Sequence, residues 1–299
     1  MRLRILLLLS LILSSATLFA QDIDQLLNDA TGNETEYTSA TFKSTRIING
    51  QSIERMPAGQ LDVRFSHRFG AINTGAYNLW GLDGPVNIHF GFDYGITNWM
   101  MVGIGRGTYQ KTYDGSLKFT ILRQSTGKKT SYISLSYFTS IAINSLNNAD
   151  LGIKNKVYFW DRASFVSQVL IARKFNERFS FELNPTYVHR NITETEMDPN
   201  DIWSVGAGAR FKLTSRISLN AEYYYVIPPI NDYRSTKTYN PLAIGFDIET
   251  GGHVFQLLLT NSQAMIEKGF IGETSSKWNN AGIHLGFNIS RVFGLKRAN

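Results

Sequence analysis

The feature that most constrains this chain is an alternation of apolar and polar side chains that recurs along most of its length. In the segment 203–213, apolar residues occupy every second position, and serine, glycine, arginine and lysine lie between them. Successive side chains of a β-strand point to opposite faces, so the pattern predicts strands with one apolar and one polar face. Twelve segments carry it, three of them less cleanly: 61–68, 86–94, 100–110, 117–121, 133–143, 165–174, 179–186, 203–213, 217–227, 242–249, 253–260 and 283–290.

The length of the strands and of their connections narrows the fold class. Most segments have about ten residues, enough for a tilted strand to cross a membrane, whereas ordinary strands average about five or six. The connections alternate between long and short, as in bacterial barrels with long outer loops and short periplasmic turns. One connection, at 112–115, is short where a long one is expected. An even number of strands returns the C-terminus to the periplasm.

Aromatic side chains gather near the predicted strand ends, among them Tyr94, Trp99, Trp160 and Trp203. Such rings suit the headgroup level of a membrane. A closed barrel also satisfies every backbone polar group inside lipid and leaves no sheet edge. We therefore predict an all-β chain with a single closed antiparallel transmembrane β-barrel of about 12 strands. A secreted soluble β-protein is the alternative.

The first twenty residues predict the compartment. Arg2 and Arg4 precede a short apolar run that ends in small residues before Ala20, the layout of a signal peptide at residues 1–20. The run is too short for a membrane-spanning helix, so a membrane anchor is the weaker interpretation. The absence of cysteine excludes lipoprotein anchoring, a disulfide scaffold and a thiolate zinc site. We expect export through the inner membrane to the outer membrane of a Gram-negative cell.

The segment 21–60 lacks the alternation and precedes the barrel domain, which we place at 61–299. It contains Asn49 and Gly50, a pair that favours a hairpin turn. The segment is either a periplasmic tail or a plug that folds into the barrel, and partial insertion is the interpretation we favour. A plug would argue against a pore that is always open.

The polar faces predict the lining of the lumen. We expect twelve side chains to face it: Arg64, Arg68, His89, Asp93, Arg106, Lys118, Glu182, Arg210, Glu222, Asp247, Glu249 and His284. The two signs of charge balance, which fits either a rigid network of paired charges or a narrow polar conduit or solute-binding site. Gly103, Gly105 and Gly107 alternate on one segment, and we expect them to make room inside the barrel.

Catalytic, cofactor and nucleic-acid functions find little support. The chain contains neither of the common hydrolase motifs H-E-x-x-H and G-x-S-x-G. Serine and histidine occur on the polar faces, so a lipid-modifying enzyme stays open, but no catalytic residue, metal ligand or cofactor site can be named. The net charge is +6, but the basic residues are scattered and form no stripe, which argues against nucleic-acid binding.

Several stretches resemble an uncharacterised outer-membrane β-barrel family of Bacteroidota, a domain of unknown function. They are LDVRFSHRFG at 61–70, GLDGPVNIHFGFDYG at 81–95, MVGIGRG at 101–107, KTYDG at 111–115, LIARKF at 170–175, DIETGGHVFQLLLTNS at 247–262, FIGET at 270–274, and 283–293. The resemblance implies a single barrel domain and no particular activity. It also points to a periplasmic partner protein, because members are encoded near periplasmic lipid- or quinone-binding proteins.

Three functions remain at this point. The first is a narrow channel or binding barrel for a small polar or amphipathic solute. The second is a structural or partner-docking barrel with an occluded lumen, whose outer loops at 144–161 and 261–282 make the contacts. The third, a lipid-modifying enzyme, has the least support. Outer-membrane lipids are the partner common to all three.

Overall fold

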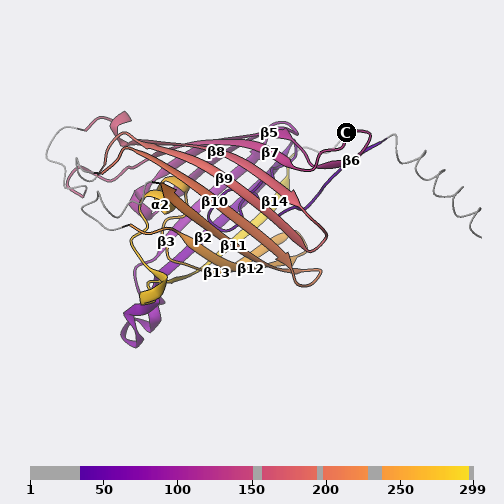
Figure 1. The fold of residues 1–299 in the computed structure, drawn as a ribbon. Coiled ribbons are helices and arrows are strands. Elements are labelled where there is room, and N and C mark those ends of the chain that lie inside the picture. The colour runs from indigo at the N-terminus through magenta and orange to yellow at the C-terminus, as the bar shows by residue number, and fades with distance from the viewer. Residues whose placement is uncertain (1–33, 151–156, 194–197, 228–237, 296–299) are drawn as a thin grey trace, which may run out of the picture.

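A computed structural model describes residues 34–150, 157–193, 198–227 and 238–295. Twelve long strands form one closed antiparallel barrel (Figure 1), which confirms the predicted fold class. The strands are β2 (Gln60–Ala71), β3 (Asn87–Gly95), β4 (Met100–Gly107), β5 (Tyr113–Leu122), β7 (Ser134–Ile143), β8 (Ala163–Lys174), β9 (Phe179–Arg190), β10 (Asp201–Lys212), β11 (Ile217–Ile227), β12 (Leu242–Thr250), β13 (His253–Thr260) and β14 (His284–Gly294). Each pairs with its neighbours along the chain, and β14 closes the barrel on β2.

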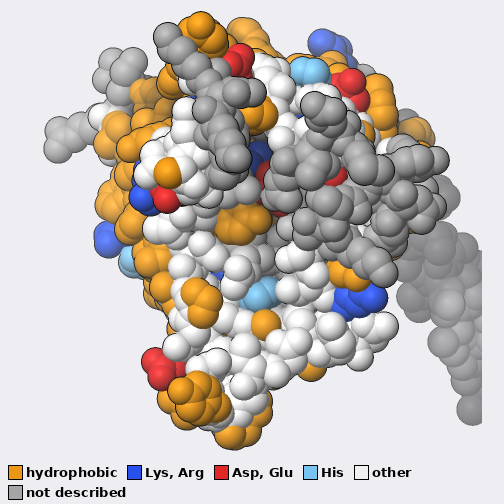
Figure 2. Space-filling model, turned by 90° about the vertical axis from the view of Figure 1, so that its left-hand side faces the viewer, with side chains coloured by type: hydrophobic (Ala, Val, Ile, Leu, Met, Phe, Trp, Pro, Cys, Tyr) orange, Lys and Arg blue, Asp and Glu red, His pale blue; other side chains and the backbone are white. Residues whose placement is uncertain are grey.

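The two faces of the wall differ as the alternation predicts. Large apolar side chains such as Ile104, Val205 and Phe246 are exposed on the outside, whereas polar side chains of the same strands are buried inside. Figure 2 looks onto one end of the barrel and shows hydrophobic side chains gathered along its rim, most clearly at the left edge of the view. A closed barrel of long strands, apolar outside and polar inside, is the architecture of an outer-membrane β-barrel. No helix among the described residues is long and apolar enough to cross a membrane.

The connections separate by length between the two ends of the barrel (Figure 1). The tight turns at 96–99, 175–178, 213–216 and 251–252 lie at one end, together with a small sheet of β1 (Thr35–Tyr37) and β6 (Ser125–Gly127). The opposite end carries the short helices η1 (Ile72–Thr74), η2 (Ala76–Gly81), η3 (Tyr109–Lys111), η4 (Trp160–Arg162), α2 (Glu267–Gly272) and η6 (Trp278–Asn280). We call the first end periplasmic and the second outer, following the loop-length rule.

One predicted connection lies elsewhere in the chain. The short outer connection occupies residues 108–112 and not 112–115, because Tyr113 already pairs with Arg106 and with Ile143. The single glycine of the expected turn, at its last position, is therefore not part of the connection. Gly115 lies inside β5 opposite Ile104, where it continues the wall.

Two segments fill the interior of the barrel. The first, which we call the plug, comprises residues 40–57 and runs from the periplasmic end into the lumen before it joins β2. The second, which we call the outer insert, comprises residues 262–274 of the connection before β14 and contains α2, all six residues of which are buried. The signal peptide expected at 1–20 lies outside the described residues.

Candidate functional site

The plug enters the lumen as a tight hairpin. Arg46 and Gln51 form an antiparallel bridge, and the backbone N–H of Ile47 donates to the carbonyl of Gly50 at 2.9 Å. The tip of the hairpin includes Asn49, so the turn expected at Asn49 and Gly50 lies deep inside the barrel. A Cβ on Gly50 would come within 2.0 Å of the hydroxyl of Tyr224, so only glycine fits at this close approach to the wall.

A single carboxylate on β11 holds the tip of the hairpin. Glu222 accepts hydrogen bonds from three consecutive backbone N–H groups, those of Ile48 at 3.1 Å, Asn49 at 2.8 Å and Gly50 at 3.1 Å. A hairpin tip cannot satisfy these donors within its own backbone, and buried N–H groups need partners. The wall therefore supplies what the turn lacks, through a charge-assisted set of bonds.

An ammonium group on β5, that of Lys118, donates hydrogen bonds to backbone carbonyls of the plug. The Lys118 Nζ atom donates to the carbonyls of Thr45 at 3.1 Å, Ser52 at 2.9 Å and Glu54 at 2.9 Å. It thereby joins the two arms of the hairpin at one point. On β9, the carboxylate of Glu182 accepts the N–H of Ile53 at 2.7 Å. Ionisable wall residues thus bind plug backbone, which ties the hairpin to one position.

Side chains of β2, β13 and β14 complete the hold on the tip. Arg68 donates to Oδ1 of Asn49 at 2.8 Å, and Asn288 donates to the carbonyl of Ile48 at 3.2 Å. Gln256 donates to the carbonyl of Ile47 at 2.7 Å. Since β2 is the first strand of the barrel and β13 and β14 are its last two, the tip is held by strands from both ends of the chain.

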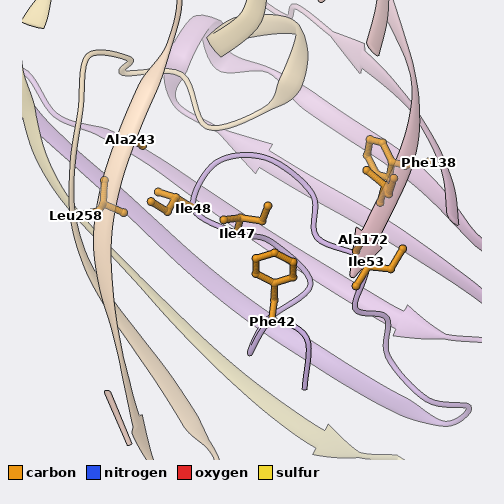
Figure 3. Close-up of a cluster of buried hydrophobic side chains, with 9 residues drawn as sticks. Phe42, Ile47, Ile48, Ile53, Phe138, Ala172, Ala243 and Leu258 are labelled. Atoms are coloured by element: carbon orange, nitrogen blue, oxygen red, sulfur yellow. The ribbon is translucent and has the colours of Figure 1, made fainter. Parts of the chain in front are cut away.

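Apolar contacts fix the plug from two sides (Figure 3). Phe42, Ile47, Ile48 and Ile53 of the plug form one buried cluster with wall residues that point inward. The wall residues are Phe138 on β7, Leu170 and Ala172 on β8, Ala243 on β12 and Leu258 on β13. They interrupt the polar inner face. Inward apolar side chains in a barrel wall therefore mark where something other than water is packed.

The outer insert closes the lumen from the other end and contacts the plug. Phe270 of α2 packs edge-on against the ring of Tyr224, with centroids 5.0 Å apart, inside a second apolar cluster that includes Val188 and Ile202. Glu267 of α2 is buried and forms an ion pair with Arg46 at 2.7 Å. The same carboxylate accepts a hydrogen bond from Gln51 at 3.2 Å. The plug and the outer insert are therefore coupled by one buried acidic group.

The space left between plug, insert and wall is small. Two cavities beside Arg46 in the middle of the lumen measure about 20 and 10 Å³, room for about one water molecule each. A cavity of about 420 Å³ instead lies at the periplasmic mouth, where Arg55 and Arg123 contribute to its lining. The lumen is thus filled in its middle and hollow at its periplasmic mouth.

The structure places eleven of the twelve expected lumen residues on the inner face. Besides the contacts described above, Arg64 pairs with Asp62 at 2.9 Å, and two further wall residues bind the plug: Asp93 accepts a bond from Thr45, and Arg210 donates to the carbonyl of Ala40. The remaining contacts are those of His89 with Asp114, Asp247 with Gln256, Glu249 with Lys43, and His284 with the carbonyl of Phe69. Most of these partners were not expected from the sequence.

Arg106 is the exception, and its expected inward position is wrong. It lies opposite Phe90 on β3 and Tyr113 on β5, two exposed residues of the outer face, and its guanidinium stacks on the ring of Tyr113 at 4.5 Å. The inward positions of β4 belong to Gly103, Gly105 and Gly107. A Cβ on Gly105 would come within 2.5 Å of Asp114, which supports the steric interpretation of these glycines.

The groups that matter most for the plug include several that the sequence did not single out. Glu267 and Arg46 lie outside the alternating segments, and Asp114 precedes the segment assigned to its strand. A buried carboxylate in a loop is not part of an alternating apolar and polar pattern, so the sequence does not mark it as buried. One clue was present for Glu267, since it lies next to the apolar stretch Ala264–Ile266, which is unusual in an exposed loop.

The histidines give no sign of hydrolase chemistry. Among the described residues, none of the five donates to or accepts from a serine; His89 pairs with Asp114, His189 with Asp201, and His284 with a backbone carbonyl. No cluster of three metal-ligating side chains occurs in the described ranges. The interactions that the described polar lumen residues make are hydrogen bonds and ion pairs.

Comparisons with known proteins agree with a barrel. Residues 42–293 match the family described as Membrane bound beta barrel domain (DUF5777). Searching curated protein sequences gave no match. Among solved structures, the chain is similar to the NanC porin (TM-score 0.48, 12% identity, 78% of this chain and 98% of that chain covered), to an outer membrane channel from Pseudomonas putida F1 (0.46, 11%, 81% and 98%) and to the KdgM porin (0.44, 7%, 78% and 98%). Likeness at this level does not indicate which solute, if any, this chain binds or transports.

Proposed function

Because the chain belongs to the family of membrane-bound β-barrel domains, we propose that it is an outer-membrane conduit that is closed at rest. A small polar solute passes when the plug leaves the lumen. The predicted signal peptide fits export to the outer membrane of a Gram-negative cell. The source in Bacteroidota and the periplasmic partner protein, both implied by the sequence resemblance, stay predictions.

The observation that supports this function is the charged wall behind the plug. Lys118, Glu182 and Glu222 are buried, and their partners are backbone groups of the plug. Buried ionised groups are a poor choice for a permanent filling, because well-packed apolar side chains of similar volume are often as stable or more so. The same groups suit a wall that water and a polar solute contact in a second state. Twelve strands also leave a barrel wider than the filled eight-stranded type.

The coupling of the two inserts explains how one movement could open both ends. If the plug withdraws, Glu267 loses its ion pair with Arg46 and its hydrogen bond from Gln51. An unpaired buried charge is strongly destabilising. Glu267 then favours water over its buried position, and the outer insert loosens.

A structural barrel with a permanently occluded lumen is the second function that an observation favours. The cavities of about 20 and 10 Å³ in the middle of the lumen are too small for any solute. In this case the charged groups would serve to hold one fixed position of the hairpin. The two functions differ in whether the plug ever leaves.

Conductance in planar lipid bilayers distinguishes them. The chain has no cysteine, so a single engineered pair can lock the plug. A Cβ on Gly208 would lie 3.5 and 3.6 Å from the two Cγ atoms of Ile47, which suits a disulfide in Ile47→Cys/Gly208→Cys. We expect rare openings of the wild type, none of the oxidised double variant, and their return after reduction. The controls are the single variant Ile47→Cys and the reduced double variant, because a Cβ on Gly208 would lie 2.2 Å from Cδ1 of an unchanged Ile47.

Deletion of residues 21–59 provides the opposite perturbation. We expect a folded barrel, judged by its heat-modifiable migration in gels, that conducts far more often than the wild type. A folded deletion variant that stays silent would refute the conduit and leave the structural barrel.

A further inference from the structure

The cavity at the periplasmic mouth has the dimensions of a ligand site. Its volume of about 420 Å³ falls within the roughly 300–1,000 Å³ of typical small-molecule pockets. One part of its lining belongs to the plug, including Ala40, Ile53 and Arg55. The other part belongs to the wall, including Leu122 and Arg123. A molecule bound here would therefore contact both.

Two guanidinium groups face this cavity without an acidic partner. Arg55 donates through Nε to the backbone carbonyl of Asn98, which leaves its two terminal nitrogens available. Arg123 stacks on the ring of Tyr37 at 4.3 Å, a contact that uses the face of the guanidinium and leaves its N–H edge free. Neither forms an ion pair with a carboxylate in the part of the chain that the structure describes. Partial burial and the neighbouring Arg123 lower the pKa of Arg55 below its ordinary value.

The acidic residue on the lining forms no ion pair with either arginine. Glu54 directs Oε1 to the backbone N–H of Phe42 at 3.2 Å, within the plug itself. Burial raises the pKa of Glu54 above its ordinary value, so its charged form is disfavoured there. Two cations on the lining of one cavity repel each other. An anion between them would remove that repulsion.

We propose that this cavity binds a small organic anion, a carboxylate or a phosphate monoester with a short apolar tail, whose head bridges Arg55 and Arg123. Guanidinium groups bind both heads through paired N–H donors. Ala40, Ile53 and Leu122 offer apolar surface for the tail.

The position of the two arginines gives the site a second consequence. Arg55 moves with the plug, whereas Arg123 follows β5 directly and stays with the wall. The bridging anion can form both contacts only while the plug is docked. Binding that favours one state shifts the equilibrium toward it, so the anion stabilises the closed lumen. This inference concerns the docked plug and does not depend on passage of a solute.

Calorimetric titration of the full-length protein in a neutral detergent tests the site. The probes are butyrate and butyl phosphate, with butyltrimethylammonium as a cation of similar size. We expect saturable binding of one or both anions and none of the cation, and the anion that binds identifies the head group. Arg55→Gln and Arg123→Gln should each weaken binding by at least about tenfold, since each removes charge-assisted bonds. Arg216→Gln, in the turn 213–216 and outside the cavity lining, should bind within about twofold of the wild type.

Amide hydrogen exchange of the plug tests the consequence and also shows whether each variant is folded. Protection of residues 45–53 in the wild type should rise about a hundredfold at an anion concentration of 100 times Kd. Exchange within β9 should not change. The proposal fails if neither anion binds, if the cation binds equally well, or if Arg216→Gln loses as much affinity as Arg55→Gln.

Discussion

Replacement of Glu222 by alanine gives the sharpest test of how the plug is held. The carboxylate accepts the N–H groups of Ile48, Asn49 and Gly50, and these three donors have no other hydrogen-bond partner among the described residues. Each buried donor left without a partner costs about 1–3 kcal/mol. Taking the lower end for three donors gives about 3 kcal/mol, which reduces the ratio of docked to released plug by about 150-fold.

Hydrogen exchange measures this ratio at the affected amides. In Glu222→Ala we expect the protection of residues 48–50 to fall by about two orders of magnitude, while exchange within β9 and β10 stays as in the wild type. Glu249→Ala is the matched control, because its ion pair with Lys43 at 2.9 Å lies near the mouth and should contribute about 1 kcal/mol or less. Unchanged protection of the tip in Glu222→Ala, with the strands intact, would show that Glu222 does not hold the plug.

Three further predictions concern the same interior. Arg46→Met leaves Glu267 buried without its ion pair, so we expect residues 264–274 to exchange at least about a hundredfold faster, consistent with a loss of about 3 kcal/mol; unaltered exchange would disprove the coupling of plug and insert. Gly95→Ala puts a Cβ within 2.0 Å of the carbonyl oxygen of Pro57; we expect lower plug protection in a barrel that keeps its heat-modifiable migration. Burial raises the pKa of Glu54 above its ordinary 4.5, so the docked plug binds a proton more tightly than the released plug. Plug protection of the wild type, measured relative to Glu54→Gln, should therefore increase as the pH falls from neutral toward about 4.5, and a decrease over that range would contradict this assignment.

The position of Arg106 shows where the alternation of apolar and polar residues fails to predict which face of a strand points inward. The segment 100–110 carries apolar residues next to glycines, so both parities contain residues that fit the lumen. Its register with Phe90 and Tyr113 settles the face, and the three glycines leave space inside for His89 and Asp114. Glycine has no side chain, so it does not indicate whether its position faces the lumen or the lipid. The sequence alone therefore does not determine the orientation of this strand.

The wall of the barrel follows from the sequence alone because lipid imposes the same condition on every spanning strand. Each strand must present apolar side chains at alternate positions and pair its whole backbone. The local sequence pattern therefore indicates the number and length of the strands and which of their side chains face outward. The contents of the lumen follow no local rule. Glu222 meets the backbone of Ile48 across 174 residues of chain, and Arg46 meets Glu267 across 221. Only the closed barrel brings such residues together, because their pairing depends on which strands face each other across the lumen and not on the residues beside them in sequence.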